Sequence, residues 1–287
     1  MPDAAFRLTE PTRRTTAVVF ASPHSGRDFP AAFLGESLLD LRQIRSSEDA
    51  FVDELLAPVP GFGAPLLAAL MPRAWVDLNR APDELDPALI EGVRSSAHNP
   101  RVLSGLGVIP RVVAAGRAIR SGKISPSEAR HRLATGWHPY HDRLRRLMDE
   151  SLSLFGRAIL FDVHSMPREA MDAFAHRPGR RPEIVVGDRH GASASEGLVR
   201  AVEDAFRAAG FQVARNAPFA GAYVAQTYGR PALGQEVVQV EIDRSLYMDE
   251  ARVEKDARFA PFARRLAPVL ARIADLGRAE GERVAAE

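Results

Sequence analysis

The sequence predicts a layered α/β domain with a largely parallel central sheet. Short apolar runs typical of buried strands alternate with segments of helical periodicity along almost the whole chain, and this alternation is the pattern of an α/β domain. Three of the apolar runs, near 17–21, 157–167 and 237–243, pass directly into polar residues. Ligands in open α/β sheets bind outside the carboxyl ends of the strands. We therefore expect the functional site at these three strand ends.

The composition of the chain narrows the classes of site and partner. Its 287 residues carry a formal net charge of +1 and include no cysteine. A chain so close to neutral gives no indication of a nucleic-acid or membrane-surface partner. Without cysteine, disulfides, thiolate zinc sites and cysteine nucleophiles are excluded, so a metal site would have to use histidine and carboxylate ligands.

No segment resembles a targeting signal or a membrane span. Residues 1–10 lack the basic segment and apolar stretch of a signal peptide, and no apolar run approaches the roughly 18 residues that a membrane span needs. We expect a cytoplasmic protein that acts on a small molecule. We also expect a single domain over residues 1–287, with a peripheral segment at residues 1–15, while the sequence does not indicate an oligomeric state.

The first half of the chain contains two predicted strands that end in polar residues. The strand at 17–21 leads to Pro23-His24-Ser25-Gly26, and a short strand at 74–78 leads to Asn79-Arg80. Between these strands, apolar side chains at helical spacing predict a helix over 37–57 that also carries acidic residues.

A long helical segment is predicted from Ser125 to about Leu154. The stretch Ser125-Pro126-Ser127-Glu128 provides a capping residue, a proline at the first helical position and a glutamate three residues after the cap. Pro139 lies inside the segment and must kink or restart the helix. Residues 88–123, before this helix, show no pattern clear enough to assign.

The strand within 157–167 carries two polar side chains near its end, Asp162 and His164. Because side chains alternate along a strand, these two residues lie on one face. Burial of an unpaired polar group costs about 2 kcal/mol or more, so their position needs a functional or structural reason.

The second half of the chain repeats the alternation of strands and helices. The stretch Ser193–Glu196 has the residues of a capping box and predicts a helix that ends at Gly210. The other expected elements of this half are strands at 183–186, 211–215 and 237–243, and a helix from about 251.

His24 and His164 share a setting that suits metal binding, since both stand where a predicted strand ends. A single histidine there is more often a hydrogen-bonded structural residue, but a catalytic zinc takes about three protein ligands, and one carboxylate would complete a site made by two histidines. Asp49, Asp53 and Glu48 are all available, and their spacing does not choose among them. In the predicted helix, Asp49 and Asp53 would share a face, with one as ligand and the other behind it.

Glu241 has the position and chemistry of a general base. It lies where the strand at 237–243 leaves the core, and a glutamate in a partly desolvated cleft can take a proton from water and pass it to a departing amine. The alternative is a structural Glu241 paired with Arg244 or another arginine. Arg244 is also a candidate for substrate binding.

Asn79-Arg80 could clamp a substrate carboxylate, because a guanidinium offers two parallel donors in a fixed plane. Taken alone, the pair fits equally a surface salt bridge from Arg80 to Asp83 or Glu84. Arg111, which follows a glycine-rich loop, is a second candidate for this clamp.

Three other residues fit two interpretations each. His138 and His141 are three positions apart and could bind a metal from one helix face, although satisfied structural histidines are the commoner case. Tyr223 could donate a hydrogen bond to an oxyanion or simply pack.

A series of polar stretches runs in order through residues 17–250. The series consists of Pro23–Gly26, Asp49-x-x-x-Asp53, Asp77–Arg80, Gly105–Arg111, His138–His141, Asp162–Ser165, Gly187-Asp188, Pro218–Tyr223 and Gln239–Glu250. The last stretch is long and specific, whereas each of the others is weak alone. Together and in this order they resemble the N-formylglutamate amidohydrolase family, which is itself similar to the zinc carboxypeptidases and aspartoacylases.

The resemblance implies a three-layer α/β/α fold of the phosphorylase/hydrolase-like, zinc-carboxypeptidase-like type, around a mixed, mostly parallel sheet. It further implies one zinc ion per chain, held by His24, His164 and an acid near Asp49. Glu241 would act as general base and acid, and Asn79-Arg80 would hold the substrate carboxylate.

The second metal ligand is where this chain departs from the related zinc carboxypeptidases. Those enzymes place a glutamate shortly after the first histidine, whereas the first acidic cluster here is Glu48-Asp49. We choose Asp49 as the ligand, with Asp53 and Glu48 as alternatives.

These expectations lead to a function. We expect a zinc-dependent amidohydrolase that removes an N-formyl or short N-acyl group from an acidic amino acid, with N-formyl-L-glutamate as the substrate that the resemblance implies. The alternatives are a carboxypeptidase-like peptidase, a deacylase for another N-acyl amino acid, and a non-catalytic metal-binding module.

Overall fold

The computed structural model describes residues 4–94, 99–174 and 181–278. The chain divides into two compact units, and it enters each of them more than once. The first unit comprises Met1–Arg7, Pro23–Ala50 and Ala68–Leu144, and the second comprises Leu8–Ser22, Phe51–Leu67 and Arg145–Glu287. The expectation of a single domain over 1–287 stays a prediction.

A mixed, mostly parallel sheet of seven strands confirms the predicted fold class. Its strands run in the order β1-β3-β2-β6-β9-β7-β8, and four short strands form two further two-stranded sheets. The strands are β1 (Phe6–Thr9), β2 (Val18–Ser22), β3 (Leu66–Ala69), β4 (Val112–Val113), β5 (Arg117–Ala118), β6 (Ala158–Met166), β7 (Ile184–Gly187), β8 (Val213–Arg215), β9 (Gln235–Asp243), β10 (Met248–Asp249) and β11 (Glu254–Lys255).

The pairings of β2, β6, β9, β7 and β8 in the large sheet are parallel with one exception. β6 pairs in parallel with both β2 and β9, β7 pairs in parallel with β8, and β7 pairs with β9 in the antiparallel direction. Every residue of β2 and β6 is buried, as expected for central strands that are covered on both faces.

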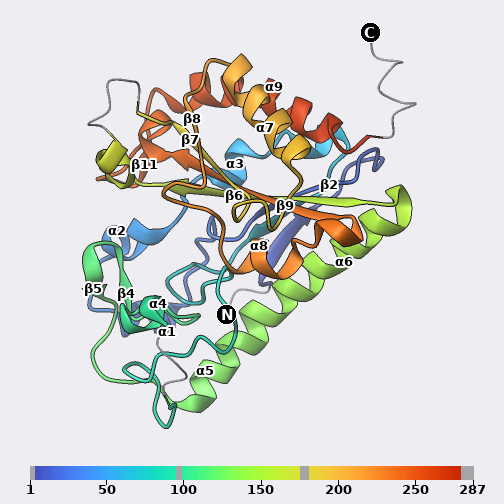
Figure 1. Ribbon diagram of the computed structural model, residues 1–287. Coiled ribbons are helices and arrows are strands. Elements are labelled where there is room, and N and C mark those ends of the chain that lie inside the picture. Colours follow the sequence, from blue (N-terminus) through green and yellow to red (C-terminus); the bar gives the residue numbers. More distant parts are fainter. Residues whose placement is uncertain (1–3, 95–98, 175–180, 279–287) are drawn as a thin grey trace. The chain divides into compact units, whose positions relative to one another are not determined.

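Helices cover both faces of these strands in the second unit. Figure 1 shows α7 and α9 on one side of the sheet and α8 on the other. The α-helices within the described residues are α1 (Ala31–Gly35), α2 (Leu41–Ile44), α3 (Val52–Leu55), α4 (Pro100–Leu103), α5 (Pro126–Arg132), α6 (His138–Phe155), α7 (Glu196–Ala208), α8 (Tyr223–Tyr228) and α9 (Phe259–Asp275). Helices on both sides of a mixed sheet form the three layers that the resemblance implied.

The predicted strands were largely right, with one exception. Strands predicted at 17–21, 183–186, 211–215 and 237–243 correspond to β2, β7, β8 and β9. The strand predicted at 74–78 was wrong, because the chain turns there instead, with Trp75 N donating to Pro72 O at 2.9 Å.

The single helix predicted over 37–57 was also wrong. The segment contains the separate short helices α2 and α3, and Phe51 between them has a left-handed backbone with φ of 67°. A long-range contact competes with the helix here, since Asp49 N donates to His24 O at 2.9 Å. Asp49 therefore precedes α3, and the expectation that Asp49 and Asp53 share one helix face does not hold.

The helix predicted from Ser125 is confirmed at its start. Ser125 Oγ accepts a hydrogen bond from Glu128 N at 3.1 Å, and helical structure continues through α5 and α6 to Phe155. A π-helical turn at Leu133–Trp137 separates the two helices. Pro139 then lies in the first turn of α6, where proline is tolerated.

Two predicted helix starts in the second half shift along the chain. The N-cap of α7 is Ser195 rather than Ser193, and Ser195 Oγ donates to Glu236 at 2.5 Å. The last helix, α9, begins at Phe259 instead of near 251, because residues 248–255 form the β10–β11 hairpin. Within the described ranges, no helix combines the length and apolarity needed to cross a membrane, and the cytoplasmic location stays a prediction.

Candidate active site

His164 and Glu241 lie side by side in the sheet of the second unit. They are register partners on the parallel neighbours β6 and β9, and Asp162 and Gln239 are partners two residues earlier. All four side chains are buried. The alternation predicted for the central strand is thus observed, and it is matched on the neighbouring strand.

Each of these two functional candidates is held by a residue of its own strand. Asp162 Oδ2 lies 3.0 Å from His164 Nε2, and Gln239 Nε2 donates to Glu241 Oε1 at 3.0 Å. These contacts compensate the cost of burying polar groups. They also fix the orientation of the imidazole and of the carboxylate.

His24 lies between two buried carboxylates in the first unit. Its Nε2 is 2.7 Å from Asp77 Oδ1 and its Nδ1 is 3.4 Å from Asp49 Oδ2. A neutral imidazole carries its proton on one nitrogen, and the shorter contact assigns that proton to Nε2. The other ring nitrogen, Nδ1, faces Asp49.

Asp77 is the carboxylate that orients His24, and it is itself held in place. Arg73 Nε donates to its Oδ2 at 3.0 Å, and Asn79 N donates to its Oδ1 at 2.8 Å. Burial alone would raise the pKa of Asp77, but the charge of Arg73 and the hydrogen bond from His24 outweigh it and hold that pKa well below its ordinary value. The carboxyl group is therefore ionised and can accept the His24 proton.

The sequence pointed to Asp77 only as part of the stretch Asp77–Arg80 and gave it no role of its own. Its partner His24 is 53 positions away, and a contact at that separation leaves no local pattern. Asp162 and Gln239 were more accessible to prediction, because each stands two residues before a candidate on the same strand.

The three acids considered as metal ligands have different surroundings. Glu48 forms a two-pronged ion pair with Arg45, at 2.7 and 3.1 Å. Asp53 lies in the first turn of α3, in the second unit. Asp49 lies beside His24, with its Oδ2 3.4 Å from His24 Nδ1.

His24, Asp49 and His164 are all buried, and together they form a group that could hold a metal ion. The strands that precede the two histidines, β2 and β6, are parallel neighbours with Ala21 opposite Asp162. Two imidazoles and one carboxylate are an N/O donor set that suits zinc.

Asn79 and Arg80 are buried in the first unit. Arg80 is 6% exposed, and its Nε donates to Leu106 O at 3.1 Å. Burial lowers the pKa of Arg80 from its ordinary value. Such burial does not fit a surface salt bridge to Asp83 or Glu84.

The remaining substrate-binding candidates have described partners of different kinds. Arg111 Nε forms an ion pair with Asp86 at 2.8 Å. Arg244 is buried, and its Nε donates to Ser165 Oγ at 3.0 Å. Tyr223 is the first residue of α8 and is half-buried.

His141 fits the structural interpretation. It is fully buried, its Nε2 lies 2.9 Å from Leu78 O, and its ring is 4.0 Å from that of Trp137. His138 is exposed. The two histidines therefore do not present one buried face to a metal.

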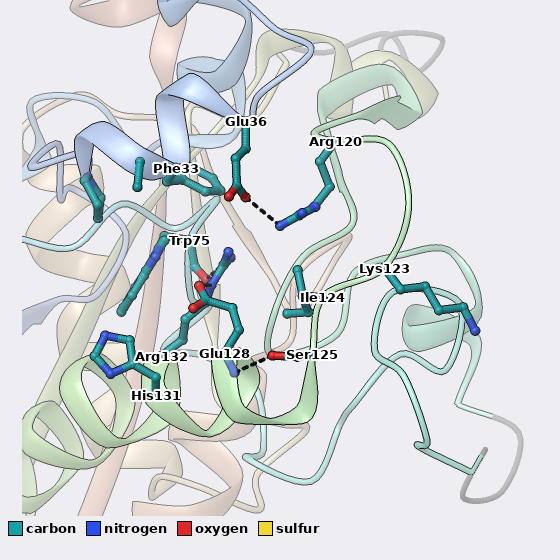
Figure 2. A pocket seen from close by; sticks show the side chains of 12 residues that line it. Phe33, Glu36, Trp75, Arg120, Lys123, Ile124, Ser125, Glu128, His131 and Arg132 are labelled. Atoms are coloured by element: carbon teal, nitrogen blue, oxygen red, sulfur yellow. Dashed lines mark hydrogen bonds and ion pairs between the residues drawn. The ribbon is translucent and has the colours of Figure 1, made fainter.

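The first unit also contains a pocket that is lined by none of the candidate site residues described above (Figure 2). Four of its charged side chains form two ion pairs, Arg120 with Glu36 at 2.9 Å and Arg132 with Glu128 at 2.8 Å. Arg132 also lies over the ring of Trp75, 5.5 Å from its centroid. The pocket thus presents two ion pairs beside an aromatic ring.

Comparison with known proteins gives concordant matches over most of the chain. The profile of the N-formylglutamate amidohydrolase family matches residues 16–248. An N-formylglutamate deformylase of Pseudomonas putida is 28% identical over 236 residues, which cover 81% of this chain and 82% of that protein. One of Pseudomonas aeruginosa is 30% identical over 257 residues, which cover 88% and 87%.

Solved structures agree with these matches. The crystal structure of an N-formylglutamate amidohydrolase from Ralstonia eutropha JMP134 has a TM-score of 0.88 and 35% identity, covering 96% of this chain and 98% of that one. The gene product Atu2144 from Agrobacterium tumefaciens, at 17% identity and a TM-score of 0.65 over 95% of this chain and 96% of its own, shares the fold.

Proposed function

The chain belongs to the N-formylglutamate amidohydrolase family, and from this premise we propose that it hydrolyses N-formyl-L-glutamate to formate and L-glutamate. Its relatives are named as deformylases and an amidohydrolase, and the chain is likewise a hydrolase that acts on an amide. The observation that carries the proposal is the pairing of His164 with Glu241 on β6 and β9. A candidate metal ligand and a candidate base thus stand next to each other where two parallel strands end.

We assign one zinc ion per chain to His24, Asp49 and His164. The donor set supports this assignment, and so do the carboxylates that contact the Nε2 atom of each ring, Asp77 for His24 and Asp162 for His164. Histidines that bind metals almost always donate their other ring N–H to such a partner. The Nδ1 atoms are then the ligand nitrogens. When bound, zinc lowers the pKa of water and polarises a carbonyl group.

Glu241 is assigned as general base and then general acid. Its carboxylate takes a proton from the attacking water and returns it to the amine nitrogen as the C–N bond of the formamide breaks. The burial of Glu241 and the hydrogen bond that its Oε1 accepts from Gln239 Nε2 support this role, because proton transfer needs a carboxylate held in a fixed position.

We assign the α-carboxylate of the substrate to Asn79 and Arg80. The burial of Arg80 supports this, because a charged hydrogen bond to a guanidinium is stronger in a site from which water is excluded. N-formyl-L-glutamate carries a second carboxylate. Arg111, Arg244 and Tyr223 remain the candidates to bind it or to stabilise the oxyanion.

A substrate panel tests the proposed function. Purified zinc-loaded protein is given N-formyl-L-glutamate, N-formyl-L-glutamine, N-acetyl-L-glutamate and a peptide with a C-terminal glutamate, and formate, acetate and free amino acids are measured. The first compound should have the highest kcat/KM, because N-formyl-L-glutamine lacks the side-chain carboxylate and the acetyl compound carries an extra methyl group.

Each other result identifies a different function. Preferred cleavage of the acetyl compound would indicate a deacylase, and release of C-terminal glutamate from the peptide would indicate a carboxypeptidase-like enzyme. If no compound is cleaved while about one zinc ion stays bound per chain, a non-catalytic metal-binding module replaces the proposal.

A further inference from the structure

Gln239 occupies the same relation to Glu241 that Asp162 occupies to His164. In each case a polar residue stands two positions before the functional candidate on the same strand, and the two pairs are in register on β6 and β9. Asp162 and Gln239 differ in chemistry because the side chains that they contact, an imidazole and a carboxylate, need different hydrogen-bonding partners. A carboxylate accepts the N–H of an imidazole, whereas an amide donates its N–H to a carboxylate.

The side-chain amide of Gln239 is engaged at both ends. Its Nε2 donates to Glu241 Oε1 at 3.0 Å, and its Oε1 accepts from Ala222 N at 3.2 Å. An ionised carboxylate can only accept and a backbone N–H can only donate, so a single orientation of the amide satisfies both partners. Gln239 is 4% exposed, and burial makes loss of either bond costly.

The loop that contains Ala222 lies directly on the sheet beside Gln239. Gly187 on β7 is the register partner of Gln239, and a Cβ atom at Gly187 would come within 2.8 Å of the carbonyl carbon of Ala220. Arg189 N also donates to Ala220 O at 2.7 Å. The backbone at 220–222 is therefore seated against β7 and β9.

The same loop is anchored at its start. Asn216 Oδ1 accepts from Asp188 N at 3.0 Å, and Asn216 N donates to Val186 O at 2.9 Å. The loop leads directly into Tyr223, the first residue of α8. A fixed loop gives Gln239 a rigid support on the side opposite Glu241.

We propose that Gln239 is a positioning residue for Glu241, which fixes the carboxylate by its amide N–H and is itself fixed by the loop at 220–222. This inference rests on the proposed function of Glu241 as base and acid. A proton transfer requires the donor and acceptor atoms to be aligned. Loss of Gln239 should therefore lower kcat more than it raises KM.

Two substitutions of Gln239 distinguish a role in positioning Glu241 from a role that is limited to holding the loop at 220–222. Gln239→Glu retains an oxygen that can accept from Ala222 N but replaces the amide donor to Glu241 by a second carboxyl group. Gln239→Met has a similar length and loses both. If Gln239 positions Glu241, both variants lose kcat by roughly 10–100-fold, the scale of a small misplacement at a reacting centre, whereas a role in the loop alone predicts that Gln239→Glu keeps wild-type kcat.

Gln235 provides the matched control, since it lies on the same strand and the same face, four residues earlier. Gln235→Glu and Gln235→Met repeat the two chemical changes away from Glu241 and should leave kcat unchanged. Rates are measured with N-formyl-L-glutamate across the pH range in which every variant stays folded, and thermal unfolding is followed in parallel.

The outcomes are distinct. A fall in kcat for both Gln239 variants, with KM little changed and with active Gln235 variants, supports the inference. Wild-type kcat in Gln239→Glu, or an equal loss in the Gln235 variants, overturns it while the proposed function stands. Failure of the wild-type protein to release formate overturns the proposed function, and the inference falls with it.

Discussion

At the scale of single residues, each candidate for chemistry is oriented by a neighbour with complementary hydrogen bonding. Asp77 holds His24, and Asp162 holds His164. Gln239 does the same for Glu241 with a donor in place of an acceptor. Such partners fix the tautomer of an imidazole or the direction of a carboxylate, so their loss weakens a site without removing any of its ligands.

Asp77→Asn should reduce zinc affinity by about 10–100-fold, because the neutral amide no longer balances the proton on His24 Nε2. Affinity is measured by competition with a chelator of known strength. Asp86→Asn is the control, since Asp86 is equally buried in the first unit but pairs with Arg111. Equal zinc affinity in wild type and Asp77→Asn would show that this contact does not orient a ligand.

Some of these site residues could be predicted from the sequence and others could not. Asp162 and His164 were predictable, because a buried strand with period-two alternation puts residues two apart on one face. The choice of Asp49 over Glu48 depends on the ion pair between Glu48 and Arg45 and on the approach of Asp49 to His24. Neither contact has a signature in a single sequence.

At the scale of elements, glycines allow backbone segments to lie close together where the site is built. Gly187 on β7 has the 220–221 backbone within 3.0 Å of the position that a Cβ atom would occupy. Any side chain there would have to displace main-chain atoms, which cannot rotate away as a flexible side chain can. The loop that leads into Tyr223 can therefore pack against β7 only because Gly187 has no side chain.

Gly187→Ala should destabilise the protein by about 1–3 kcal/mol through overpacking and should also lower the rate of formate release, because the loop at 220–222 is lifted from Gln239. Gly197→Ala in α7 is the control: nothing lies within 4 Å of a Cβ atom there, and alanine favours a helix by up to about 1 kcal/mol. Urea unfolding measures both variants. A Gly187→Ala protein as stable and active as wild type would contradict this account of the loop.

Asp188, which directly follows β7, stabilises the start of the same loop through its charged side chain. Burial by itself would raise its pKa, but hydrogen bonds from Arg215 and Asn216 outweigh burial, and the pKa of Asp188 is lowered. A carboxyl group with a lowered pKa in the folded state contributes stability above its unfolded pKa, near 4, and that contribution is lost as the pH falls through the folded value.

Asp188→Asn should therefore lower the free energy of unfolding by about 1–3 kcal/mol at neutral pH, and the difference from wild type should shrink as the pH falls below about 4. Unfolding by urea at a series of pH values measures this. A difference that stays constant from neutral pH into the acid range would show that the charge of Asp188 is not the source of its contribution.

Local patterns predicted elements well where the elements are regular. The strands and the Ser125 cap follow from alternation and capping chemistry, both of which are local. The helix predicted over 37–57 failed because Asp49 N bonds to His24 O and Phe51 adopts a left-handed backbone. Tertiary contacts of this kind override helical propensity.

At the scale of the whole molecule, fold class and family could be predicted from the sequence. The alternation of strands and helices indicated a layered α/β fold, and the order of the polar stretches indicated the family, which the matches over residues 16–248 confirm. The division into two compact units was not predicted, because each unit is assembled from segments that are distant in the chain. The absence of cysteine leaves a metal site only histidine and carboxylate ligands, which agrees with the group formed by His24, Asp49 and His164.

The most direct test of the central claim measures formate release from N-formyl-L-glutamate before chelation, after complete removal of metal, and after zinc is added back. We expect release to disappear with the metal and to return with about one zinc ion per chain. In the same assay, Glu241→Gln should still bind zinc but lose activity by about 10²–10⁴-fold. Formate release that survives complete removal of metal, or full activity in Glu241→Gln, would contradict the account.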